Sequence, residues 1–384
     1  MTELRRDPIT REWVIIAGER SKRPGYLKKK EDKKAEEKTI QDETVNCPFC
    51  PGNENKTPPE IRVDPERKPA NGPGWKVRVV ANRYPALGID KDFTDGVDRK
   101  LGQQKIGVNL AMEAYGAHEV IIESPDHNIL FEDQPIEQLE LILNRFKERL
   151  TDLYLNRKMK QFFLFKNHGK EAGASLNHPH SQLMTYAVVP DELKKELNGA
   201  KEYYEKERSC IWCAILDQNW MDLIKKDPDT GEPLQTDPFE ERMVLKNQSF
   251  VVLCPFASIY PYEMHIIPRR HSHFYGNINF QEIKDLAITF KTVIKKLNKA
   301  LQDIHSESAP YNLALHTSPN LTFREDDPAK FRTIKEDSHW HFEIYPVGVA
   351  TPGTVERGKG IPINSYSPEF AAKELREAQI EENK

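Results

Sequence analysis

The sequence lacks an excess of charge of either sign, because 56 Lys and Arg stand against 60 Asp and Glu and leave a formal net charge of −4. Such a balance gives no reason to expect nucleic acid or a membrane surface as a partner. No apolar run approaches the roughly 20 residues of a membrane-spanning helix, and the N-terminus lacks a signal-peptide pattern. We therefore expect a cytoplasmic globular protein whose 384 residues suffice for two domains.

Cysteine is also scarce, and four of the five cysteines form two Cys-x-x-Cys pairs, Cys47 with Cys50 and Cys210 with Cys213. Thiolates bound to a metal fit a cytoplasmic enzyme better than a disulfide scaffold does. The remaining Cys254 lies in an apolar stretch, where we expect it to pack as a small hydrophobic residue. The cysteine pattern therefore points to metal binding.

The chain repeats one plan in its two halves. In each half a Cys-x-x-Cys is followed by a β-rich run and then by a strand predicted to end at a histidine, His127 or His271. Apolar residues then step by three and four over 136–153 and 283–297, which predicts an amphipathic helix packed on the core in each half. A further strand follows, and each half closes on paired histidines.

This repetition predicts an α+β fold with two pseudo-symmetric halves, residues 1–196 and 197–384. Each half is expected to contain mainly antiparallel sheet with flanking helices. The C-terminal stretch 368–384 is predicted to be an exposed helix. Solvated excursions or loops are expected at 26–43, 227–231 and 320–337.

The repeated cysteines and histidines predict two metal sites. Zinc prefers four nitrogen or sulfur ligands in a tetrahedron, and closed four-ligand sites of this kind are structural. His273 is an alternative to His271, and Glu196 and His316 are reserve ligands if the second site is built differently. We expect Zn²⁺ at both sites, with iron possible at the second. The predicted ligand sets are Cys47, Cys50, His127 and His178 in the first half, and Cys210, Cys213, His271 and His339 in the second.

The segment His178-Pro-His180-Ser-Gln182 carries the predicted chemistry. Two histidines and a glutamine alternate along a predicted strand, so their side chains share one face. A neutral imidazole can attack phosphorus, and the preceding glycine-containing loop, 167–175, can offer backbone N–H groups and a hydroxyl to phosphate oxygens. The alternative is a satisfied histidine pair in a loop. With His178 on the metal, His180 is the group left free to react.

These residues resemble a known family, the galactose-1-phosphate uridylyltransferases and their close relatives, the plant-type ADP-glucose phosphorylases, in the histidine-triad superfamily. The resemblance runs nearly end to end and implies that both halves have the histidine-triad-like fold. It is carried by Arg11-Glu-Trp-Val14, Arg20-Ser-Lys-Arg23-Pro24, Cys47-Pro-Phe-Cys50, Asn82-Arg-Tyr-Pro85, Ser124-Pro-Asp-His127, the Asn167 loop, His178–Gln182, His316-Thr-Ser-Pro319 and His339-Trp-His341.

The resemblance implies roles for individual residues. His180 corresponds to the nucleophile that forms a covalent nucleotidyl-histidine, and Gln182 to the residue that bonds the phosphoryl oxygens. Ser175 is counted with them as catalytic. The paired Cys-x-x-Cys motifs look more like the two-zinc phosphorylase branch, and family members imply a homodimer. The positions that match substrate contacts are Arg20, Arg23, Asn82, Asn167, Glu356 and Lys359.

The C-terminal loop departs from the usual family pattern. Val355 stands where uridylyltransferases usually carry an aromatic residue, and Arg357 and Lys359 add positive charge. Two explanations account for this departure equally well. One is neutral drift in a surface loop, and the other is a substrate acceptor that is smaller and more anionic. The default expectation is uridylyl transfer between UDP-glucose and galactose 1-phosphate.

The alternatives keep or discard the histidine chemistry. One is adenylyl transfer from ADP-glucose or adenylyl sulfate to phosphate. Another is a hydrolase, which is disfavoured because Gln182, unlike a third histidine, is a poor proton shuttle for water. The last is a non-catalytic, zinc-stabilised nucleotide-binding or scaffold protein, which the intact His180 and Gln182 disfavour.

Overall fold

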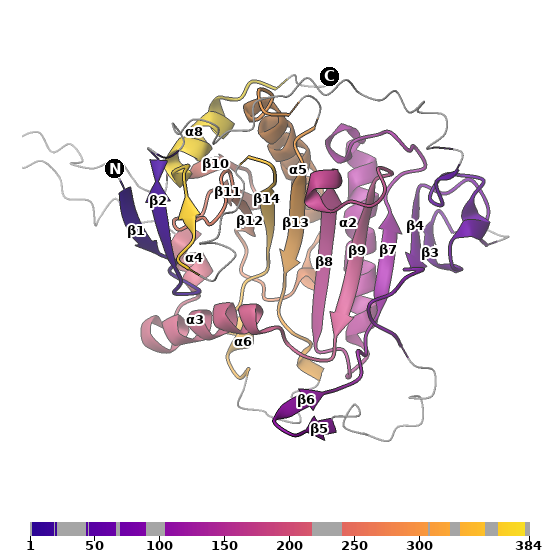
Figure 1. Ribbon diagram of the computed structural model, residues 1–384, viewed down its shortest axis with the longest axis horizontal. Coiled ribbons are helices and arrows are strands. Elements are labelled where there is room, and N and C mark those ends of the chain that lie inside the picture. The colour runs from indigo at the N-terminus through magenta and orange to yellow at the C-terminus, as the bar shows by residue number, and fades with distance from the viewer. Residues whose placement is uncertain are drawn as a thin grey trace, which may run out of the picture.

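The computed structural model describes residues 2–18, 20, 44, 46–66, 70–89, 104–216, 240–305, 308–322, 331–349 and 360–380. The segments predicted at 26–43 and 227–231 lie outside these residues. Ten strands form one sheet in the order β10-β11-β12-β14-β13-β8-β9-β7-β4-β3, and every neighbouring pair is antiparallel (Figure 1). The strands are β3 (Glu60–Asp64), β4 (Val77–Ala81), β7 (His118–Ile122), β8 (Gln161–His168), β9 (His180–Tyr186), β10 (Met243–Lys246), β11 (Phe250–Leu253), β12 (Met264–Pro268), β13 (Tyr311–His316) and β14 (His341–Pro346).

The sheet is pseudo-symmetric about the pair formed by β8 and β13. Outward from this pair the order is β8-β9-β7-β4-β3 on one side and β13-β14-β12-β11-β10 on the other. In each half, the fourth of its five strands along the chain (β8 or β13) lies at the centre of the sheet, and the fifth (β9 or β14) lies beside it. The predicted α+β fold with two pseudo-symmetric, mainly antiparallel halves is therefore confirmed, and the two halves share a single sheet. Helix α3 (Asp191–Glu207) runs across residue 196, the predicted boundary between the two halves. The position of that boundary stays a prediction.

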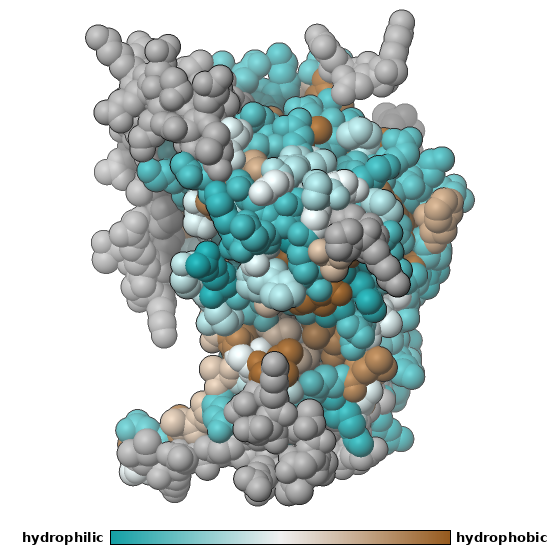
Figure 2. Space-filling view, turned by 90° about the vertical axis from the view of Figure 1, so that its right-hand side faces the viewer, coloured by the Kyte–Doolittle hydropathy of each residue, from teal (hydrophilic) through white to brown (hydrophobic). Residues whose placement is uncertain are grey.

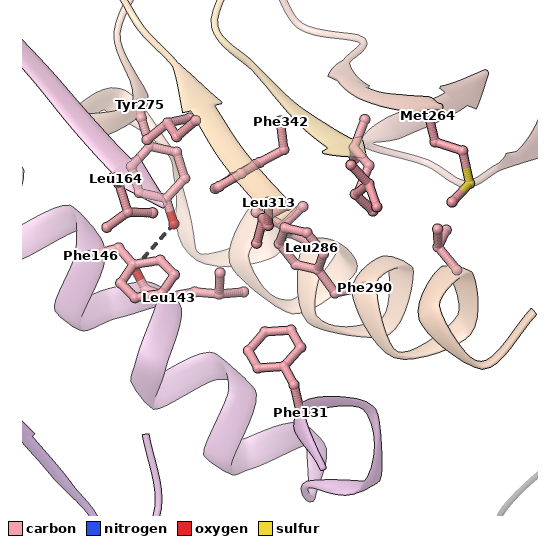
Figure 3. Close-up of a cluster of buried hydrophobic side chains, with 14 of the residues drawn as sticks. Phe131, Leu143, Phe146, Leu164, Met264, Tyr275, Leu286, Phe290, Leu313 and Phe342 are labelled. Carbon is pink, nitrogen blue, oxygen red and sulfur yellow. Dashed lines mark hydrogen bonds between the residues drawn. The ribbon is translucent and has the colours of Figure 1, made fainter. Parts of the chain in front are cut away.

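One face of the sheet is covered by the two predicted amphipathic helices, α2 (Ile136–Tyr154) and α5 (Phe280–Ala300). Their apolar stripes pack against strands of both halves in one continuous hydrophobic core (Figure 3). The phenol of Tyr275 crosses between the halves and donates to the carbonyl oxygen of Leu143 at 3.1 Å. Because strand residues alternate between faces, every second side chain of β9 points away from this core, on the open face of the sheet.

The remaining elements lie around the sheet. Strands β1 (Thr2–Arg6), β2 (Trp13–Ala17) and β15 (Ile363–Asn364) form a small sheet at one side, and β5 (Gln104–Ile106) and β6 (Asn109–Ala111) form a separate hairpin (Figure 1). Figure 2 views the molecule from the side of β3 and β4 and shows a mostly hydrophilic surface, with hydrophobic residues gathered below its middle. No helix in the described ranges has the length and apolar character needed to cross a bilayer. The shorter helices are α4 (Ile211–Leu216), α6 (Ile334–Asp337) and α8 (Pro368–Glu377), with 3-10 turns at Glu54–Lys56, Phe131–Asp133, Lys170–Ala172 and Tyr275–Asn277.

Two predicted strand ends are wrong. Strand β7 ends at Ile122 and β12 at Pro268, so the predicted ligands His127 and His271 lie in the following loops. In the first loop the Ser124 hydroxyl accepts from the backbone N–H of Asp126 at 3.0 Å, a local turn that competes with strand pairing.

The C-terminal helix is not exposed on all sides. Helix α8 buries Ala371, Ala372 and Leu375 in the main core, since these small or apolar residues recur at helical spacing on one face. The segment predicted as a loop at 320–337 also contains α6, and Asn320 is fully buried.

Candidate active site and metal centres

The four predicted ligands of the first half converge on one point. The Cys50 Sγ lies 3.3 Å from His127 Nδ1 and 3.5 Å from His178 Nδ1, and Cys47 Sγ lies 3.7 Å from His178 Nδ1. The two Nδ1 atoms are 3.3 Å apart. Zn–S and Zn–N bonds of about 2.3 and 2.05 Å in a tetrahedron give S···N edges of roughly 3.5 Å and N···N edges of roughly 3.3 Å. The donor set therefore fits a zinc ion.

The second half repeats this arrangement. The Cys213 Sγ lies 3.4 Å from His271 Nδ1 and 3.6 Å from His339 Nδ1, and Cys210 Sγ lies 3.9 Å from His339 Nδ1. The ligand atoms of each set lie within 4.8 Å of one another. His273 does not join this set, because its Nδ1 bonds the Ser318 hydroxyl at 2.8 Å. The structure thus favours His271 over the predicted alternative.

Backbone carbonyls hold three of these four imidazoles in the tautomer that a metal needs. The Nε2–H groups of His178, His271 and His339 donate to the carbonyl oxygens of Ser124, Lys335 and Pro268 at 2.8, 2.8 and 2.9 Å. A proton on Nε2 leaves the lone pair of Nδ1 directed at the cluster. Burial and the adjacent Cys47 sulfur raise the pKa of Cys50 to about 12, so a cation is needed to hold this sulfur as a thiolate.

His180 is the first residue of β9 and lies on the open face of the sheet. Its Nδ1–H donates to the carbonyl oxygen of His178, a predicted metal ligand, at 2.8 Å, and the ring of Phe49 packs against it with centroids 5.3 Å apart. Nε2 has no hydrogen-bond partner among the residues that the structure describes. Burial lowers the pKa of His180, although the bond to the His178 carbonyl opposes this shift. The ring is therefore neutral, with the lone pair of Nε2 free.

A buried ion pair supports the strand from the opposite face. Lys166 on β8 lies 2.6 Å from a carboxylate oxygen of Glu123, and its ammonium group also donates to the carbonyl oxygen of His180 at 3.2 Å. The second oxygen of Glu123 accepts from the Ser181 hydroxyl at 2.5 Å. All four residues are less than 9% exposed. These bonds fix the backbone that aims the His180 ring.

Gln182 follows His180 on the same face. Its Oε1 lies 2.9 Å from His118 Nε2 and accepts from Asn82 Nδ2 at 3.3 Å. Its Nε2 group makes no hydrogen bond within the described part of the chain. Gln182, His180, Ser175 and Asn82 all line one cavity of about 540 Å³. The predicted catalytic residues are therefore together.

The predicted substrate contacts divide into three groups. Asn82 lines the cavity just described, whereas Asn167 lines an adjoining cavity of about 380 Å³ that also contains His180, Lys166 and Lys170. Arg20 is exposed and lines neither of these two cavities. The predicted contacts Arg23, Glu356 and Lys359 lie outside the described residues.

The second half carries an altered copy of the site. His341 donates from Nδ1 to the carbonyl oxygen of His339 at 3.1 Å and packs against the ring of Trp212, with centroids 4.1 Å apart. Its Nε2, however, lies 3.2 Å from Glu343, which stands where the first half has Gln182. The reserve ligands Glu196 and His316 bond each other at 2.8 Å beside this pair, apart from the Cys-x-x-Cys cluster.

Sequence reasoning missed several residues of the site. Phe49 and Trp212 occupy the same place in the two Cys-x-x-Cys motifs, so the repeat could have revealed an aromatic partner for each histidine. Lys166 follows an apolar strand run, and a charge at such a place is a signal of a buried pair. His118 carried no signal, because its contact with Gln182 depends on the pairing of β7 with β9.

Comparisons with known proteins cover nearly the whole chain. Residues 1–190 match the N-terminal and residues 214–378 the C-terminal domain model of galactose-1-phosphate uridyl transferase. The ADP-glucose phosphorylase of Arabidopsis thaliana is 32% identical over 98% of this chain and 93% of that protein. The galactose-1-phosphate uridylyltransferase of Thermotoga maritima is 28% identical over 99% and 100%.

Two solved structures have the same fold over almost their whole length. The crystal structure of an ADP-glucose phosphorylase from Arabidopsis thaliana with bound ADP-glucose has a TM-score of 0.75 at 29% identity, covering 99% of this chain and 100% of that one. A uridylyltransferase structure has a TM-score of 0.66 at 25% identity, covering 98% of both chains. The chain belongs to the galactose-1-phosphate uridylyltransferase family of nucleotidyltransferases.

Proposed function

We propose that this nucleotidyltransferase works in two displacements through a covalent bond to His180. In the first, Nε2 attacks the α-phosphorus of a nucleoside diphosphate sugar, the bond to the bridging oxygen breaks, and the sugar 1-phosphate leaves. In the second, an oxygen of the acceptor phosphate attacks the same phosphorus and His180 leaves as a neutral imidazole. Each step is an in-line transfer at one site, which avoids bringing two anionic substrates together.

The free Nε2 of His180 is the observation that carries this proposal. It lies at a cavity large enough for a nucleotide and next to Gln182, whose amide can donate to phosphoryl oxygens without adding charge. The Nδ1–H bond to the His178 carbonyl leaves only Nε2 for attack and stabilises the imidazolium of the intermediate. The further phosphate contacts that we propose are Ser175, Asn167, Arg20 and Arg23. Glu356 is proposed as a contact to a sugar hydroxyl, and Lys359 as a further substrate contact.

The proposed donor is ADP-glucose and the proposed acceptor is inorganic phosphate, so the products are glucose 1-phosphate and ADP. The 32% identity to an ADP-glucose phosphorylase over nearly the whole of both chains supports this choice, as does the similarity to a structure with bound ADP-glucose. The expectation from the sequence placed UDP-glucose and galactose 1-phosphate first. The comparisons give more support to its adenylyl alternative.

Uridylyl transfer is the second candidate, because the Thermotoga maritima uridylyltransferase matches this chain over its full length at 28% identity. Purified protein is to be incubated separately with ADP-glucose, UDP-glucose and adenylyl sulfate, each labelled in the nucleotide, and quenched in base, where phosphoramidate bonds survive. Peptide mass spectrometry then locates the label. We expect AMP from ADP-glucose on His180 and none in a His180→Ala variant. Label on no residue, or on a residue other than His180, would overturn the mechanism.

Two Zn²⁺ ions belong to the same proposal, with iron as the alternative at the second site. They act as structural ions, because four protein ligands leave no open position for substrate. A homodimer is also proposed, on the resemblance to the family alone. Sedimentation of the purified chain measures its mass directly.

A further inference from the structure

Whether Gln182 can donate hydrogen bonds to a phosphoryl group depends on which end of its amide faces the cavity. An amide has one acceptor oxygen and one donor nitrogen, and only the nitrogen can donate to phosphoryl oxygens. A flipped amide would present its oxygen to an anion instead. Something must therefore hold the oxygen away from the substrate.

A backbone N–H group fixes the first of the two donors to that oxygen. The N–H of Tyr84 donates to Asn82 Oδ1 at 2.9 Å. A backbone N–H can only donate, so the amide of Asn82 has its oxygen towards Tyr84 and its nitrogen towards Gln182. From there Asn82 Nδ2 donates to Gln182 Oε1 at 3.3 Å.

A second backbone N–H fixes the other donor. The N–H of Ala86 donates to Nδ1 of His118 at 3.2 Å, so Nδ1 is the unprotonated nitrogen of this ring. The proton of the neutral imidazole therefore lies on Nε2, which donates to Gln182 Oε1 at 2.9 Å. The Nε2 of His118 is also 3.1 Å from Asn82 Nδ2. Both nitrogens are donors, and both direct a hydrogen to Oε1 of Gln182.

We propose that His118 is a positioning residue, which with Asn82 holds the oxygen of Gln182 so that its amide N–H groups face the reacting phosphoryl group. The inference rests on the proposed function, since it concerns how Gln182 meets the substrate. The inference also assigns a role to the turn 82–86. Two of its backbone N–H groups set the orientation of one side chain and the tautomer of the other, and both side chains then orient Gln182.

Two substitutions at position 118 separate the donor from the bulk of the ring. His118→Gln keeps an N–H near the place of Nε2, whereas His118→Met has similar length and no donor. Both are compared in the wild-type background and in a Gln182→Ala background, where no amide remains to be oriented. The measurement is the single-turnover rate of His180 labelling by ADP-glucose, together with kcat and KM.

We expect His118→Met to lower the labelling rate and kcat by about two- to tenfold with little change in KM, because one orienting hydrogen bond is lost. His118→Gln is expected to restore most of the rate. In the Gln182→Ala background the two variants should label equally fast.

Two outcomes would overturn the inference. One is that His118→Gln and His118→Met lower the labelling rate equally. The other is that His118→Met lowers the rate as much in the Gln182→Ala background as in the wild-type background. Thermal melting of all variants identifies loss through unfolding, and the rate is expressed per folded molecule. Failure of the proposed function is distinguishable, because it would already appear as absence of His180 labelling in the wild-type chain.

Discussion

His341 Nε2 lies 3.2 Å from a carboxylate oxygen of Glu343, two positions further along β14. At the corresponding place in the first half, Gln182 turns its oxygen towards His118 and leaves Nε2 of His180 without a partner in the described residues. A carboxylate both occupies an imidazole nitrogen and repels phosphate. One residue therefore distinguishes the proposed reactive half from its altered copy.

Gln182→Glu should give the proposed reactive half the same side-chain pair as its altered copy. We expect the rate of His180 labelling to fall by about 10²- to 10³-fold, since a phosphoryl donor is replaced by a negative charge. The rate should recover in part at low pH, where a protonated carboxyl group can donate. Rapid-quench labelling over a pH series measures both effects.

Glu343→Gln is the matched control for this change. It alters the same pair of side-chain types in the second half, and we expect labelling of His180 per folded molecule to stay as in the wild type. A Gln182→Glu enzyme that labels at the wild-type rate would contradict the account of why the two halves differ.

The sequence predicted the elements that depend on local pattern and repetition. The helices predicted over 136–153 and 283–297, which the structure extends to 136–154 and 280–300, came from spacing and repetition, as did the paired histidines and both candidate ligand sets. The joining of the halves into one sheet through β8 and β13 could not be predicted, since no pattern in one strand specifies a partner that far along the chain. The bond between His118 and Gln182 was missed for the same reason, because strand register decides it.

Loss of one thiolate ligand should remove one metal ion and leave the other. We expect two bound metal ions per wild-type chain, one in Cys50→Ala and one in Cys213→Ala, counted by elemental analysis of purified protein. Structural zinc contributes on the order of 10 kcal/mol to folding in small domains, so both variants should melt at much lower temperature.

Cys254→Ala is the control for the cysteine substitutions. Its sulfur is buried in the main core and belongs to neither ligand set, so both metal ions should remain despite some loss of packing. Two metal ions in the Cys50→Ala variant, or fewer than two in Cys254→Ala, would contradict the assignment of ligands.

Removing one charge of the Lys166–Glu123 ion pair should lower the free energy of unfolding more than removing both charges together. Lys166→Met leaves a buried carboxylate without its cation, and we expect the free energy of unfolding to fall by about 3–5 kcal/mol. Lys166→Met combined with Glu123→Gln removes both charges and should recover part of that loss. Urea denaturation of the three proteins checks this order, and a double variant less stable than Lys166→Met would refute it.

His316 should make the stability of the protein fall as the solution becomes alkaline. Burial disfavours its charged form, but Glu343 and Glu196, at 3.2 and 2.8 Å, outweigh burial and raise the pKa of His316 from 6.5 to about 9. A raised pKa in the folded state gives stabilisation that is complete below pH 6.5 and is lost as the pH rises through 9. Over that interval the free energy of unfolding should fall by up to about 3 kcal/mol relative to His316→Gln. Denaturation of both proteins between these pH values measures the difference, and parallel curves would show that His316 is not held in its charged form by the two carboxylates.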